Sequence, residues 1–251
     1  MEVCVDSLES VINAYEGNAD RIELCSSLNE GGLTPTYGLL KSVKKYLSNK
    51  ERNFGIFCMI RCRAGDFCYS DNEIDTMIED LNKFIELEVD GLVFGALDSS
   101  GIVDESVIKQ LLQLIPATSK IETTFHRAFD VCSDWNKCFQ QIKSLGFTRL
   151  LTSGQKKTAF EGRDLIAHLV RDSSIIILPG AGINSSNLEQ LISETKCKEF
   201  HASCRSSRDS LMVFRNKNVP MGSDLETEFI INYTDKKKVK ELSDIFRRNK
   251  I

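Results

Sequence analysis

Short runs of β-branched and other apolar residues alternate with longer stretches along the chain, and this alternation occurs eight times. In the longer stretches apolar residues recur every three or four positions, as in Val107, Leu111 and Leu114, which is the spacing of an amphipathic helix. A helix between consecutive strands returns the chain to a parallel partner, so the strands are expected to be parallel. The eight runs predicted to be strands are Glu2–Val5, Arg21–Cys25, Gly55–Arg61, Gly91–Leu97, Ile121–His126, Arg149–Thr152, Ile175–Pro179 and Glu199–Cys204.

This pattern predicts an α/β fold of the TIM type, because eight strand–helix units in 251 residues match the ~250 residues typical of a (β/α)8 barrel. No linker rich in proline, glycine or serine interrupts the alternation, so residues 1–251 are expected to form one barrel domain. Residues 205–234 are expected to form an extended loop before a closing helix capped by Asp235. In such barrels the chemistry lies in the loops at the carboxyl ends of the strands.

Successive side chains of a strand point to opposite faces of the sheet, and this alternation places polar side chains inside the barrel. Glu2 and Cys4 share one face of the first strand, and the opposite, apolar face is expected to lie under the helices. Buried charge is costly unless it is paired. Two interpretations stay open: an internal salt-bridge network, for example Arg21 with Glu122 or Glu199, and a functional pocket at the ends of the strands.

Composition narrows the function classes. The net charge of −4 argues against nucleic acid as a partner. No apolar run approaches the ~20 residues that span a bilayer, so no membrane partner is expected, and the amino terminus lacks the basic region of a signal peptide. The nine cysteines are an odd number without a CxxC pair, which indicates reduced thiols in the cytoplasm rather than disulfides or a zinc ribbon.

Two cysteines are candidate metal ligands. Cys4 and Cys25 are the last inward residues of consecutive strands, and adjacent strands lie ~4.8 Å apart. At the same height, two such soft thiolates would suit Cu(I) rather than Mg²⁺ or Ca²⁺. The alternative is that both are small buried hydrophobic residues.

Arginines and glycines at the ends of three strands are candidate anion-binding residues. Arg61 and Arg63 follow the third strand, Gly180 and Gly182 the seventh, and Arg205 the eighth. Arginine forks fit carboxylate and phosphate, and barrel phosphate sites are often built from the last two of these loops. Pairing of the arginines with nearby carboxylates, and tight turns that require glycine, are the alternatives.

Two histidines are candidate catalytic acid–bases. His126 and His201 have inward parity at the ends of their strands, and Glu23 could hold one of them in a defined tautomer. The alternative is that both are structural residues held by hydrogen bonds. His168 lies in an expected helix and is predicted to be on the surface.

Several runs of the chain together resemble the copper homeostasis protein CutC family. They are Met1–Asp6, Ala19–Cys25, Gly91–Leu97, Thr124–Asp130, Leu151–Gly154, Pro179–Ile183 and the stretch from Glu199 to Asn216. The resemblance implies a (β/α)8 barrel, self-association into a homo-oligomer and a cytoplasmic location, in animals also the nucleus. It also implies Cu(I) binding by two cysteines that align with Cys4 and Cys25. Cys62 stands where a proline is usual in the family, and Ala64 and Ala181 replace glycines.

Two functions therefore remain open at the level of sequence. One is a copper homeostasis protein that holds Cu(I) between two cysteines. The alternative is a barrel enzyme that acts on an anionic small molecule bearing a phosphate or carboxylate. A metal carrier should tolerate the changes Arg61→Ala and His126→Ala, whereas the enzyme should not.

Overall fold

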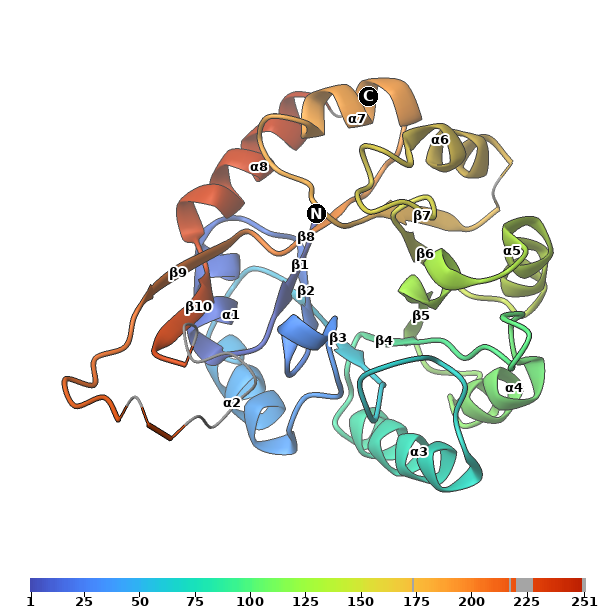
Figure 1. Cartoon of the computed structure of the whole chain (residues 1–251), viewed down its shortest axis with the longest axis horizontal. Helices are drawn as coiled ribbons and strands as arrows, with labels where there is room; N and C mark the ends of the chain where they lie inside the picture. The colour runs from blue at the N-terminus through green and yellow to red at the C-terminus, as the bar shows by residue number, and fades with distance from the viewer. Residues whose placement is uncertain (173, 217, 220–227, 250–251) are drawn as a thin grey trace.

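Eight parallel strands form the centre of a nearly closed barrel, and eight helices surround it (Figure 1). The structure is a computed structural model that describes residues 1–172, 174–216, 218–219 and 228–249. The strands are hydrogen-bonded in the order β7-β6-β5-β4-β3-β2-β1-β8. The predicted (β/α)8 fold is confirmed.

β1 and β6 have the predicted bounds, and the other six strands of the barrel are shorter than the runs that predicted them. They are β1 Glu2–Val5, β2 Arg21–Leu24, β3 Gly55–Met59, β4 Gly91–Phe94, β5 Glu122–Phe125, β6 Arg149–Thr152, β7 Ile176–Pro179 and β8 His201–Ala202. The shortening has a local cause at β3, where the backbone N–H of Arg61 donates to Oγ1 of Thr34, 3.0 Å away, rather than to a neighbouring strand. Similarly, the N–H of Leu97 donates to the carbonyl of Phe67 in the loop after β3.

A helix follows each of the first seven barrel strands, and two further strands, β9 Arg205–Asp209 and β10 Ile230–Thr234, come between β8 and α8. The helices are α1 Leu8–Glu16, α2 Tyr37–Leu47, α3 Asp71–Glu86, α4 Glu105–Gln113, α5 Trp135–Ser144, α6 Arg163–Arg171, α7 Leu188–Thr195 and α8 Lys236–Arg248. Two short 3₁₀ helices, Leu28–Glu30 and Arg127–Val131, lie in the loops after β2 and β5. No helix in the described ranges is both long and apolar enough to cross a membrane.

The closing helix is confirmed. The side chain of Asp235 accepts hydrogen bonds from the backbone of Lys237 and Lys238, which satisfies the first turn of α8. Val239, Leu242 and other apolar residues of α8 are buried against the barrel. The helix thereby covers the wall beside β1 and β8 (Figure 1).

The parity predicted from the strands is also confirmed. The outward side chains, such as Val3, Ile22 and Cys58, belong to the large apolar core that includes residues from the surrounding helices. The inward side chains form a much smaller apolar cluster of Cys25, Phe57, Met59 and Val93. The lumen also holds buried charged side chains, among them Glu2, Arg21 and Arg149.

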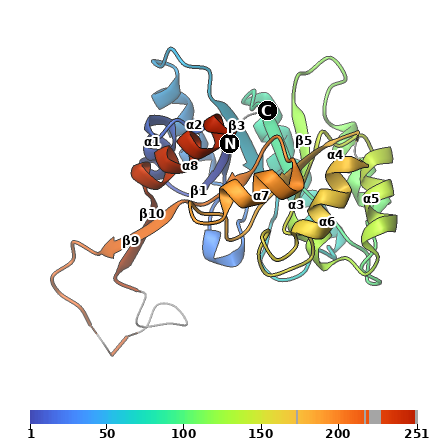
Figure 2. The ribbon, with the colours of Figure 1, turned by 90° about the horizontal axis from the view of Figure 1, so that it is seen from above.

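A two-stranded antiparallel ribbon leaves the barrel after β8. It consists of β9 Arg205–Asp209 and β10 Ile230–Thr234 and projects away from the ring of helices (Figure 2). These two strands form the ends of the segment 205–234 that was expected to be an extended loop. Residues 217 and 220–227 of that segment lie outside the described residues.

Candidate functional site

A pocket of about 450 Å³ opens among the loops that follow the barrel strands, where the fold class predicted a site. It brings together residues at or just beyond the ends of seven of the eight barrel strands. The predicted site residues that line it are Cys4, Glu23, Arg61, His126, Gly182, His201 and Arg205. Among the described residues, Cys25, Arg63 and Gly180 do not line it.

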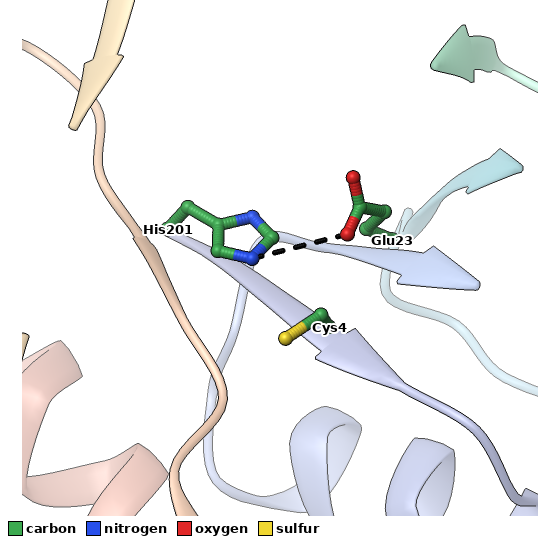
Figure 3. Close-up of side chains that lie close together, drawn as sticks. All are labelled: Cys4, Glu23 and His201. Atoms are coloured by element: carbon green, nitrogen blue, oxygen red, sulfur yellow. Dashed lines mark ion pairs between the residues drawn. The ribbon is translucent and has the colours of Figure 1, made fainter. Parts of the chain in front are cut away.

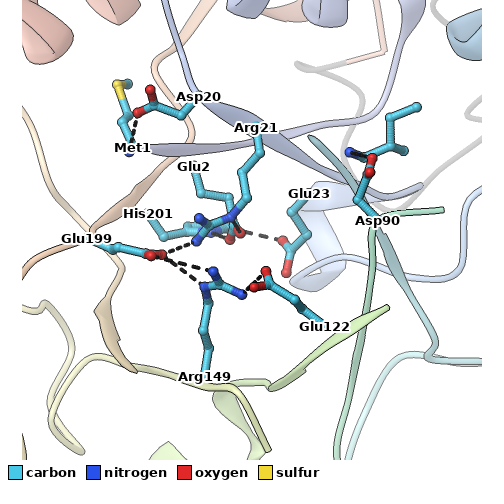
Figure 4. A network of polar contacts seen from close by, with 11 residues as sticks. Met1, Glu2, Asp20, Arg21, Glu23, Asp90, Glu122, Arg149, Glu199 and His201 are labelled. Carbon is cyan, nitrogen blue, oxygen red and sulfur yellow. Dashed lines mark hydrogen bonds and ion pairs between the residues drawn. The ribbon is translucent and has the colours of Figure 1, made fainter. Parts of the chain in front are cut away.

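Below the pocket, a salt-bridge network fills the barrel floor (Figure 4). Arg21 Nε lies 2.6 Å from Glu2 Oε2, and Arg21 also contacts Glu199. Arg149 Nε lies 2.9 Å from the same Oε2 of Glu199, and Nη1 of Arg149 pairs with Glu122. The predicted network exists, but Glu122 pairs with Arg149 rather than with Arg21, because β6 is the immediate neighbour of β5.

An aromatic ring lies against both guanidinium groups. The Cζ atoms of Arg21 and Arg149 lie 5.0 and 5.3 Å from the centre of the Phe57 ring. Such cation–π contacts add to the carboxylate pairs in holding the two charges in the lumen. Phe57 thus helps to form the polar floor although it is itself apolar.

Three potential metal ligands meet directly above this floor (Figure 3). One ligand atom from each of Cys4, Glu23 and His201 lies within 4.8 Å of the others, and all three residues are buried. The register explains the meeting: Cys4 is the partner of Glu23 across β1 and β2, while Glu2 pairs with His201 across β1 and β8. We call these three residues the floor cluster.

The orientation of His201 is set by Glu2, whose Oε1 lies 2.7 Å from Nδ1 of the imidazole. The other nitrogen, Nε2, lies 3.8 Å from Oε2 of Glu23. The sequence suggests Glu23 as a residue that could hold one of the two histidines in a defined tautomer, and at His201 the short contact to Nδ1 comes from Glu2 instead. From the sequence, Glu2 is predicted only to be a charged residue inside the barrel. Its contact with His201 depends on the register between β1 and β8, which no sequence motif indicates.

Burial and charge perturb the acid–base behaviour of these groups. Burial opposes charge on His201, but its interactions with Cys4 and Glu23 raise the pKa of this residue well above the ordinary value. Burial raises the pKa of Glu23 to about 7. Burial would do the same at Glu2, but the charge of Arg21 and the hydrogen bond from His201 hold the pKa of Glu2 well below its usual range.

Cys25 lies one inward position further along its strand than Glu23. Because Glu23 is the residue level with Cys4, the expectation that the two thiols lie at the same height is wrong. The Cys25 thiol instead donates to Oε2 of Glu23 at 3.5 Å. The carboxylate of Glu23 therefore lies close to both thiols. Burial, with Glu23 and Cys4 nearby, raises the pKa of Cys25 well above its ordinary value.

Arg61 holds two loops together at the pocket wall. Its Nη1 donates to the carbonyls of Glu30 and Gly32, at 2.6 and 3.2 Å, and its Nη2 to that of Gly65 at 2.8 Å. The guanidinium also stacks on the Phe67 ring, 4.8 Å from its centre. Within the described part of the chain, this buried cation has no carboxylate partner.

His126 is buried beside Arg61 in the same wall. Its Nδ1 accepts a hydrogen bond from the backbone of Ala128 at 3.3 Å, so the proton of the neutral ring lies on Nε2. That Nε2 has no partner among the described residues. Burial, with a contribution from the Arg61 charge, lowers the pKa of His126 to about 3, so the ring is neutral.

Of the other two predicted anion-binding arginines, one lies outside the pocket and one lines it. Arg63 forms ion pairs with Asp66 and with Glu73 of α3, outside the pocket. For this arginine the alternative, pairing with nearby carboxylates, is therefore correct. Arg205 lines the pocket, with Nη2 3.3 Å from Asp6 and Nη1 3.0 Å from Asn29.

The two glycines differ in role. A Cβ on Gly180 would lie 2.7 Å from Cδ1 of Leu151, so the glycine lets this side chain pack closely against the loop. Gly182 has φ +70° and its loop lines the pocket. His168 is exposed, as predicted.

Comparison with known proteins gives consistent matches. The model of the CutC family matches residues 1–206. The human copper homeostasis protein cutC homolog is 44% identical over 248 residues, covering 98% of this chain and 88% of that protein. The CutC family protein of Parabacteroides distasonis is 42% identical over 243 residues, covering 96% of this chain and 97% of that protein.

Solved structures agree. A CutC structure from Streptococcus agalactiae is 36% identical with a TM-score of 0.74, over 80% of this chain and 97% of that one. A thiamine phosphate pyrophosphorylase from Pyrococcus furiosus, 15% identical with a TM-score of 0.56 over 99% of this chain and 95% of that one, shares the fold alone.

Proposed function

The chain belongs to the CutC family of copper homeostasis proteins, and we propose that it binds one Cu(I) ion at the floor of its pocket. The observation that carries the proposal is the floor cluster, in which ligand atoms of Cys4, Glu23 and His201 lie within 4.8 Å of one another. A thiol and an imidazole in a buried site are ligands that suit copper.

Cys25 supplies the second thiol in this proposal. Its sulfur lies 3.5 Å from the Glu23 carboxylate, on the side of that residue toward the strand ends. Two sulfur ligands and one imidazole form a soft set that favours Cu(I) over Mg²⁺ and Ca²⁺. Glu2 supports the set from outside, because a carboxylate on Nδ1 fixes the ring orientation and leaves Nε2 for the ion.

A Cu(I) competition titration of the reduced protein tests this proposal. We expect one Cu(I) per chain, and we expect Cys4→Ser and Cys25→Ser each to lower the affinity at least tenfold, since a hydroxyl is a hard, poor ligand for Cu(I). Cys68→Ser is the matched control, because Cys68 is exposed and outside the pocket. Binding by the Cys4→Ser/Cys25→Ser double variant that equals wild type would refute the site.

We also propose that the protein self-associates through the ribbon and works in the reducing cytoplasm. Leu211 and Val213 beyond β9 are 97% and 98% exposed, and Phe214 is also exposed. Large exposed apolar patches mark interaction surfaces. The nine cysteines are all free thiols, which suits a reducing compartment. Sedimentation should show an oligomer that Val213→Ser/Phe214→Ser weakens, and an unchanged mass would contradict the assignment to the ribbon.

A further inference from the structure

We propose that the upper part of the pocket binds the carboxylate group of a small organic molecule, between the Arg61–His126 wall and the loop after β7. This site is additional to the copper site. The sequence led us to expect an anionic ligand, and the site narrows that expectation to a carboxylate. Arg63, one of the arginines in that expectation, has no part in it.

The size of the pocket is the first argument. Its volume of about 450 Å³ lies within the ~300–1,000 Å³ of pockets that hold small molecules. One metal ion between the side chains of the floor cluster occupies only a small part of that space. The walls above the floor therefore have room for an organic ligand.

The charge of Arg61 is the second argument. Arg61 is 5% exposed, and the hydrogen-bond acceptors of its guanidinium within the described residues are backbone carbonyls. Carbonyls accept hydrogen bonds from Nη1 and Nη2, whereas Nε has no partner among the described residues, and the charge is left without a counter-ion. Burial of an unpaired charge is costly, so an anion in the pocket would be stabilised by this residue.

His126 adds a directional donor to the same wall. Its backbone partner at Nδ1 places the proton on Nε2, and this buried N–H has no acceptor among the described residues. A buried donor without a partner costs about 1–3 kcal/mol. An oxygen of a bound carboxylate would relieve that cost. Gly95 makes room for the ring, because a Cβ there would lie 2.7 Å from Nδ1 of His126.

The loop after β7 faces the same pocket with backbone donors. The N–H groups of Ala181, Gly182 and Ile183 have no acceptor within the described ranges, and all three residues line the pocket. Ala181 and Gly182 both have positive φ, +81° and +70°. Successive amides in such a loop are a common way to bind an anion.

The balance of charge favours a carboxylate over a phosphate. Arg127 is paired with Asp130 and Arg205 with Asp6, so their charges are already compensated. His126 is neutral. Among the described arginines that line the pocket, Arg61 is the one without an ion pair, and one carboxylate would neutralise its charge whereas a phosphate dianion would exceed it.

Thermal denaturation of the reduced, metal-free full chain tests the proposal. The probes are acetate, succinate and citrate, with inorganic phosphate as the competing anion and chloride as the ionic-strength control. We expect at least one carboxylate to raise Tm with increasing concentration through linkage, and to shift the ¹⁵N signal of His126 Nε2. His126→Phe, which keeps a ring beside Phe67 but removes the donor, should weaken the Kd at least tenfold.

Two further variants make the result specific. His168→Phe changes an exposed histidine of α6 and should respond as wild type. Cys4→Ser/Cys25→Ser should keep the carboxylate response while losing copper, so failure of either proposal is separate from failure of the other. No Tm shift with any carboxylate, a shift with phosphate alone, or a wild-type response in His126→Phe would each overturn the carboxylate site.

Discussion

At the scale of single residues, a missing side chain shapes the lumen. Gly91 opens β4, and a Cβ there would lie 2.2 Å from Cδ1 and Cε1 of Phe57. The ring needs that space to lie against Arg21 and Arg149. Gly38 at the start of α2 is the opposite case, because a Cβ there would meet nothing within 4 Å.

We predict opposite effects of one methyl group at these two glycines. Gly91→Ala should lower the free energy of unfolding by about 1–3 kcal/mol, because the well-packed lumen must shift to admit it. Gly38→Ala should raise it by about 0.5–1 kcal/mol, because alanine favours the helix. Calorimetry of the two variants gives both values. A Gly91→Ala protein as stable as wild type would show that Phe57 can move freely.

At the scale of elements, the floor network connects strands that are distant in sequence. Arg21 of β2 contacts Glu2 of β1 and Glu199, just before β8. Glu199 also contacts Arg149 of β6. The pairs therefore reach across the lumen toward the edge between β7 and β8, where the described residues show no strand ladder.

Removal of Arg21 should be strongly destabilising. Arg21→Met would leave Glu2, which is fully buried, without its arginine, at a cost of about 3–5 kcal/mol. Lys83→Met is the control, because its pair with Glu86 is exposed and worth at most about 1 kcal/mol. Denaturant unfolding compares the two. An unchanged midpoint for Arg21→Met would contradict a structural role for the network.

Much of this architecture could be predicted from the sequence, because it depends on periodicity. Alternation along each strand predicted the polar lumen, and helical spacing with Asp235 as cap predicted the closing helix α8. The stagger between strands could not be predicted, since it depends on how the whole barrel closes. That stagger places Glu23, not Cys25, level with Cys4. It also makes Glu2 the cross-strand partner of His201.

The contacts that the loops make could not be predicted from the sequence either. Arg61 and Arg63 are separated by one residue and carry the same side chain, so no sequence pattern distinguishes them. In the structure Arg61 turns inward to loop carbonyls and Arg63 outward to Glu73. Only the folded positions of the loops after β2 and β3 decide which arginine lines the pocket.

At the scale of the whole molecule, the buried carboxylates make stability depend on pH. Burial favours the neutral acid at Glu199, but hydrogen bonds from Arg149 and the charge of Arg21 lower its pKa below the ordinary value. The folded state then binds fewer protons at this group than the unfolded state does. The stabilisation is present above the unfolded pKa of ~4.3 and is lost as the pH falls through the folded pKa.

We therefore predict that Tm falls as the pH is lowered from about 4.3 toward 3, and that Glu199→Gln falls less steeply. The amide keeps the shape of the side chain but cannot titrate, so its contribution does not change with pH. Glu86→Gln, at an exposed pair, should keep the slope of wild type. Parallel curves for Glu199→Gln and wild type would contradict a role of Glu199 in acid stability.

We propose that copper is bound by sulfur and imidazole ligands at the floor of the pocket, above the salt-bridge network. X-ray absorption at the copper edge of the reduced, copper-loaded protein tests it most directly. We expect an edge characteristic of Cu(I) and a first shell containing sulfur from Cys4 and Cys25 with nitrogen from His201. The sulfur contribution should fall in Cys25→Ser and the imidazole contribution should disappear in His201→Ala. A first shell of oxygen and nitrogen without sulfur would contradict the account.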